Sequence, residues 1–147
     1  MNMPGRVIAI DWGAARIGLA ASDPTRTLAT PRHTLYEKDK GQQTKKVAAF
    51  IVEEEATLVL VGLPLMLDGS DSETTRSARK FAEKLQTLIP VQVVLVDERL
   101  SSVEAEELLA ESGFRSKSKA DKGRIDSAAA AVMLQRWLDT RPRTENA

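Results

Sequence analysis

The chain has 147 residues, enough for one domain, and 42% of them are hydrophobic, enough for a buried core. Its 21 basic and 21 acidic residues cancel, so any nucleic-acid binding depends on local charge and not on a uniformly basic surface. There are no cysteines, which excludes disulfides, zinc-thiolate sites and thiol catalysis. The first apolar run is too short for a signal peptide and no stretch is long enough to span a membrane, so we expect a cytoplasmic protein.

Three antiparallel strands are predicted at the start of the chain. An apolar run over 7–10 ends on Asp11, a second strand covers 17–23, and a third covers 27–35. Pro31 places the third strand at an edge of the sheet or at a bulge, because proline cannot donate a ladder hydrogen bond. The turn residues between these strands indicate a meander.

The rest of the chain alternates between helical and strand patterns. Apolar residues at helical spacing predict helices over 41–55, 72–88, 101–109 and 124–138, and continuous apolar runs predict buried strands over 58–62 and 91–96. Strands joined by helical crossovers are parallel. We therefore expect one α/β domain over residues 1–140, with a mixed five-stranded sheet flanked by helices, and a polar tail over 141–147.

Acidic side chains stand where these predicted elements end or begin. Asp11 and the pair Asp97–Glu98 follow buried strands, and Asp126 lies in the first turn of an apolar helix, on its packed face. Ligand sites lie beyond the carboxyl ends of parallel strands, so these groups are expected to converge. Carboxylates that converge without basic partners repel one another, and bound Mg²⁺ or Mn²⁺ relieves the repulsion. Two such ions about 4 Å apart clamp the attacking and leaving oxygens of a phosphodiester.

Each of these carboxylates also has a purely structural explanation. Asp11 at a strand end accepts hydrogen bonds from a turn, and Asp126 complements the dipole at the start of a helix. The segment 97–99 is then an ordinary ion-paired loop. Spacing alone leaves both alternatives open.

Two groups of basic residues stand out. Arg115, Lys117, Lys119, Lys122 and Arg124 fall just before Asp126, and Arg76, Lys80 and Lys84 follow one face of the helix predicted over 72–88. Basic segments are usually solvated surface. The segment 115–124, however, is predicted to be a loop near the acidic cluster, where a phosphate backbone would need neutralising.

The chain also contains four segments in a specific order and spacing. They are Ile10-Asp11-Trp12-Gly13 with Arg16-Ile17-Gly18-Leu19-Ala20 and Ser22-Asp23; Val61-Gly62-Leu63-Pro64-Leu65 with Asp68-Gly69-Ser70 and Phe81-Ala82; Val96-Asp97-Glu98-Arg99-Leu100-Ser101; and Ile125-Asp126 with Ala128-Ala129. Together they resemble the YqgF/RuvX family of Holliday junction resolvases and pre-16S rRNA nucleases. The chain departs from the usual pattern at Met66, where the family often has Asn, and at Ala15, where a basic residue is common.

The resemblance implies an RNase H-like fold and metal-dependent cleavage of structured nucleic acid. It implies Asp11, Asp126 and one acid of the pair Asp97–Glu98 as catalytic residues and metal ligands, and of the pair we favour Glu98. Two Mg²⁺ or Mn²⁺ ions are the implied cofactors, with no nucleotide cofactor. Candidate substrate-binding residues are Arg16 and Arg99 from the family segments, with Lys117, Lys119, Lys122 and Arg124 from the basic segment.

Processing of the 5′ end of pre-16S rRNA during ribosome biogenesis is the leading functional hypothesis. The alternatives are resolution of branched DNA and a non-catalytic RNA- or ribosome-binding module. An ATPase or sugar kinase is disfavoured, because that architecture needs two such lobes and the chain has the length for one. The expected binding partners are pre-16S rRNA or branched DNA, and ribosomal particles. We expect no association with a membrane, and a protein that is a monomer or a homodimer.

Overall fold

The structure is a computed structural model that describes residues 3–98, 107 and 119–140. Within these ranges the elements are β1 (Arg6–Asp11), β2 (Arg16–Ser22), β3 (Ala29–Tyr36), α1 (Lys40–Glu53), β4 (Ala56–Leu63), α2 (Glu73–Gln86), β5 (Val93–Asp97) and α4 (Lys119–Thr140). The helix predicted over 101–109 lies outside the described residues, apart from Glu107, and so does the tail predicted over 141–147.

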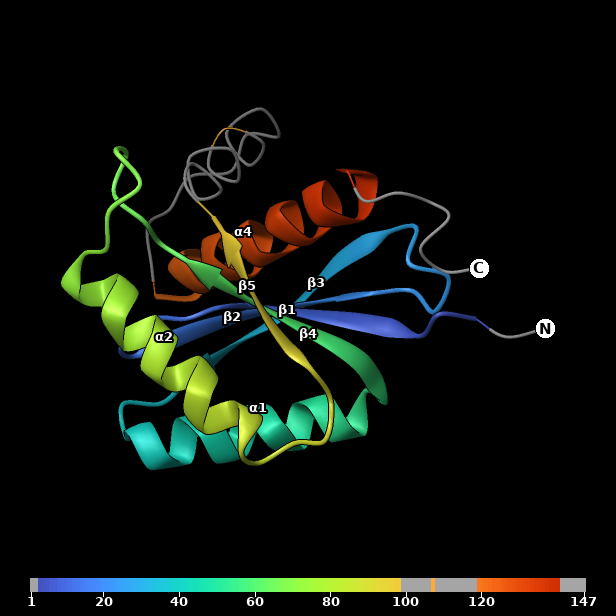
Figure 1. Ribbon diagram of the computed structural model, residues 1–147, viewed down its shortest axis with the longest axis horizontal. Helices are drawn as coiled ribbons and strands as arrows, with labels where there is room; N and C mark the ends of the chain where they lie inside the picture. The colour runs from blue at the N-terminus through green and yellow to red at the C-terminus, as the bar shows by residue number, and fades with distance from the viewer. Residues whose placement is uncertain (1–2, 99–106, 108–118, 141–147) are drawn as a thin grey trace.

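The five strands form one mixed sheet in the order β3-β2-β1-β4-β5 (Figure 1). β1 pairs antiparallel with β2, and β2 pairs antiparallel with β3, whereas β4 runs parallel to both β1 and β5. The predicted meander followed by parallel strands is therefore confirmed. β3 is an edge strand, and its register with β2 shifts between Gly18 and Ala20, next to the pair Ala20–Pro31, as the proline predicted.

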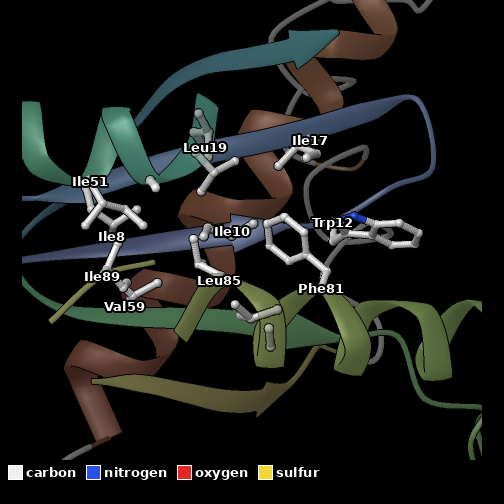
Figure 2. Packing of buried hydrophobic residues seen from close by; sticks show 14 of the residues in the cluster. Ile8, Ile10, Trp12, Ile17, Leu19, Ile51, Val59, Phe81, Leu85 and Ile89 are labelled. Carbon is white, nitrogen blue, oxygen red and sulfur yellow. The ribbon is translucent and has the colours of Figure 1, made fainter. Parts of the chain in front are cut away.

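Helices cover both faces of the sheet (Figure 1): α1 and α2 lie on one face and α4 on the other. Successive side chains of a strand point to opposite faces. On β1, Ile8 and Ile10 therefore pack against α1 and α2 (Figure 2), while Val7 and Ala9 pack against α4. The alternation continues to Asp11, which consequently lies on the α4 face.

Each of the first two helices begins at a side-chain cap. The carboxylate of Asp39 accepts a hydrogen bond from the backbone N–H of Gln42, 2.8 Å away, at the start of α1. Ser72 and Thr75 form a reciprocal capping box at the start of α2. Among the described helices none is long and apolar enough to cross a membrane.

β5 corrects one prediction, because it is not a buried strand. It stands at the edge of the sheet, its side chains are half-buried or exposed, and Leu95 is 41% exposed. Val93 packs against the cluster under α1 and α2, and Val94 and Val96 pack against the cluster under α4. A short apolar run fits a central strand and a partly covered edge strand equally well, so the sequence pattern did not distinguish them.

The last helix corrects a second prediction, because α4 begins at Lys119 and not near Arg124. Gly123 lies inside the helix at a close contact with β3: a Cβ there would fall within 3.3 Å of Tyr36 and Thr34 side-chain atoms. The hydroxyl of Thr34 donates to the carbonyl of Gly123. Glycine weakens an isolated helix, but here it permits close packing, which the local pattern does not reveal.

Candidate active site

Strand alternation brings Asp11 and Glu98 to the same face of the sheet. Glu98 follows Val94 and Val96 at two-residue spacing and, like them, lies on the α4 side, where it is only 8% exposed. Its backbone N–H donates to the carbonyl of Leu63, 3.2 Å away, which extends the β4–β5 pairing by one residue. Asp97 is exposed. Glu98 is therefore the acid of this pair that meets Asp11.

The carboxyl groups of Asp11 and Glu98 are hydrogen-bonded to each other. Burial and the charge of Asp11 raise the pKa of Glu98 well above its ordinary value. Burial, followed by the charge of Asp126, also raises the pKa of Asp11. Without a cation, burial and the mutual repulsion of the two acids therefore favour one proton shared by the pair.

Two glycines stand level with Asp11 in the neighbouring strands, Gly62 against Glu98 and Gly18 against the backbone of α4. Gly18 on β2 is the register partner of Asp11, and Gly62 follows Val61, the partner of Ile10. A Cβ on Gly62 would lie 2.3 Å from Glu98 Oε2 and 2.8 Å from the sulfur of Met133. A Cβ on Gly18 would lie 2.2 Å from the carbonyl oxygen of Asp126.

The close approach at Gly18 brings Asp126 of α4 to the sheet. The Arg16 Nε atom lies 2.8 Å from Asp126 Oδ2, with 36% and 20% of the two side chains exposed. Burial raises the pKa of Asp126, and the charge of Arg16 opposes that effect. This buried oxygen has no hydrogen-bond partner among the residues that the structure describes, so the contact is an ion pair and not an aligned hydrogen bond.

The prediction that Asp126 lies in the first turn of its helix is wrong. It lies seven residues after the start of α4, so the dipole at the start of a helix does not explain it. Asp126 also has a basic partner, because Arg16 pairs with it. In the described part of the chain no group of three or more acidic or histidine side chains is assembled closely enough to hold a metal ion as it stands.

An open cleft of about 830 Å³ lies beside Asp11, Arg16 and Asp126. Its lining includes Asp11, Asp126 and Arg16, the loop 12–15, and residues 36–38 after β3. Gln43 of α1 fixes the loop: its Nε2 donates to the carbonyls of Ala14, 2.9 Å away, and Glu37, 2.7 Å away. The acidic groups are therefore approached along a wall that α1 holds in position.

The basic segment is only partly described. Lys119 and Lys122 belong to the first turns of α4 and Arg124 is exposed on the same helix, so the prediction of a loop up to Arg124 is wrong. Arg99, Lys117 and the side chains of Lys119 and Lys122 lie outside the described residues.

Sequence reasoning missed four contributors to this site: Gly18, Gly62, Gln43 and Lys38. Both glycines interrupt apolar strands at positions level with Asp11, a pattern that marks close approach of another group. Gln43 is 1% exposed within a helix, and nothing in its sequence context separates it from a surface glutamine. Lys38 lines the cleft only because β3 ends beside the loop 12–15.

Comparison with known proteins identifies the family. Residues 5–140 match the family described as RuvX: Holliday junction resolvase. The chain belongs to this family. A relative from Anaeromyxobacter sp. (strain Fw109-5), named "Putative pre-16S rRNA nuclease", is 43% identical over 136 residues, which cover 92% of this chain and 98% of the relative. A relative of the same name from Rhodococcus erythropolis (strain PR4 / NBRC 100887) is 44% identical over 144 residues, which cover 95% of this chain and 80% of the relative.

Solved structures show the same fold at low sequence identity. RuvC of Thermus thermophilus superposes with a TM-score of 0.57 at 13% identity, covering 92% of this chain and 97% of RuvC. Fowlpox virus resolvase, in a complex with Holliday junction DNA, superposes with a TM-score of 0.56 at 9% identity, covering 92% of this chain and 97% of the resolvase. The predicted RuvX membership, RNase H-like fold and nuclease class are confirmed.

Proposed function

We propose that this RuvX-family nuclease is a divalent-metal-dependent endonuclease that trims the 5′ end of pre-16S rRNA in the cytoplasm. The observation that carries the proposal is the contact of buried Glu98 with Asp11, which lines an open cleft together with Asp126 and Arg16. A fold alone needs no such pair, because two hydrogen-bonded carboxyl groups at a strand edge cost stability whenever both ionise.

The acidic residues suit a hard divalent cation. Asp11 at the end of β1 and Glu98 after β5 supply oxygen ligands across the intervening strand β4. Asp126, whose buried Oδ2 atom has no hydrogen bond but is paired with Arg16, lines the cleft together with Asp11. We assign Asp11, Glu98 and Asp126 as the residues that would hold Mg²⁺ or Mn²⁺, with two ions as the expected number. Bound there, the metal would supply Lewis-acid stabilisation of the charge that develops on a phosphodiester in hydrolysis.

The protein's own groups prepare the site for a polyanionic substrate. Asp11 and Glu98 become fully ionised only when the proton that they share is displaced. Arg16 holds Asp126 against the sheet and is itself partly exposed to the cleft, where its guanidinium would bind a phosphate. Lys38, which also lines the cleft, adds a second positive charge. The substrate is thus held by backbone phosphates, which position it without reading its sequence.

Two substrates remain in competition. The curated relatives carry the pre-16S rRNA name, whereas the family description and the resolvase complexes concern Holliday junctions. We favour the RNA, because the full-length relatives at 43–44% identity carry that name, and the resolvase structures share the fold at 9–14% identity.

The test is a cleavage assay with the purified protein on two labelled substrates, a 16S rRNA precursor and a four-way DNA junction. We expect Mg²⁺-dependent cleavage of the precursor that a chelator abolishes, and slower or no cleavage of the junction. Preferential junction cleavage would replace the substrate assignment. Binding of the precursor without cleavage at any Mg²⁺ or Mn²⁺ concentration would favour a non-catalytic RNA-binding module.

Gly62→Ala provides a test of the site's geometry. Its new methyl group would overlap Glu98 Oε2, which must move away from Asp11. Displacing a group that orients metal ligands typically costs about 10- to 100-fold in activity, and we expect a loss of that size. Gly41→Ala in the first turn of α1 is the matched control, since its added Cβ meets only the side-chain oxygen of Asp39, at 3.3 Å. Full activity in folded Gly62→Ala protein would show that the position of Glu98 is unimportant.

A further inference from the structure

A second hollow lies between α1 and α2, on the face of the sheet opposite α4. It has a volume of about 140 Å³. Lys40 and Gln43 line it from α1, and Lys80, Phe81 and Lys84 line it from α2. Trp12, which follows β1, also lines it. Trp12 and Phe81 are 7% and 6% exposed, with ring centroids 6.3 Å apart (Figure 2), so they form an apolar floor below the lysines.

This α1–α2 groove carries a positive charge that no ion pair with a described residue balances. Among the described residues none of its three lysines has an acidic partner within 4.0 Å. Of the cations outside the groove on the same two helices, Lys46 is paired with Glu37 at 2.6 Å and Arg79 with Asp71 at 2.8 Å. Lys80 and Lys84 are also one helical turn apart on α2, a spacing at which like charges repel and weaken the helix. An anion in the groove would remove that repulsion.

The groove adjoins the acidic cleft through a shared wall. Trp12 lines both hollows and directly follows Asp11 in the chain. Its indole Nε1 donates to Gln43 Oε1, 3.2 Å away, and the same glutamine holds the loop 12–15 of the cleft. Basic residues continue along this path, with Lys38 in the cleft and Lys40 in the groove.

We propose that the α1–α2 groove binds the phosphate backbone of the nucleic-acid substrate on the far side of Trp12 from the acidic cleft. The substrate strand would pass from the cleft over the wall formed by Trp12 and Gln43 and continue across Lys80 and Lys84. This inference rests on the proposed nuclease function and extends it. Lysine ammonium groups on flexible stems bind successive phosphates as point charges, so the contact adds affinity without sequence preference. A substrate too short to reach the groove would lose this contribution.

The test measures binding in a chelator, so that the substrate is not cleaved. The dissociation constant of a structured RNA that extends beyond the cleft is measured at several salt concentrations for the wild type and for Lys80→Ala and Lys84→Ala, singly and together. Each substitution is expected to reduce the logarithmic salt slope by about 0.7 to 0.9, the contribution of one phosphate contact. Lys80→Arg with Lys84→Arg should keep the wild-type slope, since the charge remains. Lys45→Ala, an exposed α1 lysine outside the groove, is the matched control and should also leave the slope unchanged.

The outcomes separate this proposal from the nuclease assignment. An unchanged salt slope in the folded double alanine variant would show that the groove does not bind substrate phosphates, even if Mg²⁺-dependent cleavage is observed. A reduced slope would support the proposal, even if no cleavage is found. An equal reduction of the salt slope in Lys45→Ala would also contradict the proposal, because the reduction would then reflect the net charge of the protein and not a contact in the groove. Finally, binding of a mononucleotide that depends on Lys80 and Lys84, with no effect of these residues on RNA binding, would assign the groove to a small anion instead.

Discussion

Asp11→Asn is expected to reduce metal-dependent cleavage by at least about 100-fold while the protein remains folded. Asparagine preserves the size of the side chain and one acceptor oxygen but removes the charge through which Asp11 would hold the metal. Loss of several kcal/mol of metal-derived transition-state stabilisation corresponds to this factor or more. Single-turnover cleavage at saturating Mg²⁺ measures it. Wild-type rates in contaminant-free Asp11→Asn protein would eliminate Asp11 as a catalytic residue.

The same substitution has a second readout that does not depend on activity. Burial and the charge of Asp126 raise the pKa of Asp11 to about 7 from 3.8. An acid whose pKa is raised by folding stabilises the fold while it is protonated, and that stability is lost as the pH rises through the folded value. In a chelator the wild type should therefore lose stability between about pH 5 and pH 8, on the order of 1–3 kcal/mol. Asp11→Asn should show a shallower decline.

Added metal should reverse this dependence. Mn²⁺ or Mg²⁺ that binds the ionised acids raises the melting temperature of the wild type at pH 8, because the ligand binds only the folded state. Asp11→Asn should show a much smaller rise. Thermal unfolding at the two pH values, with and without metal, measures both effects. Equal pH slopes and equal metal-induced shifts in the two proteins would contradict the assignment of Asp11 to the metal site.

The sequence was most informative where periodicity and strand ends carry the argument. The apolar run over 7–10 predicted a strand, which is the central strand β1, and Asp11 at its end lines the cleft. Pro31 identified an edge strand, because its missing N–H is a local property. The strand pattern and the effect of the proline depend on residues close together in the chain. They are therefore the same whichever element packs against the strand.

What the sequence did not reveal depends on distances between elements. The pair Arg16–Asp126 joins β2 to α4, and it forms because Gly18 lets the helix backbone approach β2 at that level. The close packing of the first turns of α4 against β3 similarly needs the missing side chain of Gly123. A glycine within a predicted strand can mark a bulge or a close contact, and within a helix it can mark a packing contact. Only the assembled sheet shows which of these applies.

Glu98→Gln and Asp97→Asn form a pair of substitutions that separates two adjacent acids. Glu98 is buried and hydrogen-bonded to Asp11, whereas Asp97, the last residue of β5, is exposed. Adjacent residues of an extended strand point to opposite faces. We therefore expect Glu98→Gln to lose about 100-fold or more in cleavage, comparable with Asp11→Asn, and Asp97→Asn to lose less than about tenfold.

The expected difference is one of side-chain direction, since each substitution removes one negative charge and changes size very little. Cleavage at saturating Mg²⁺ measures it, with circular dichroism and thermal unfolding to verify that both proteins are folded. In a chelator at pH 8, Glu98→Gln should be at least as stable as the wild type, because burial penalises the ionised acid. A folded, inactive Asp97→Asn beside an active Glu98→Gln would exchange the roles of the two acids. Wild-type activity in both Glu98→Gln and Asp97→Asn would show that catalysis does not need a second acid beside Asp11.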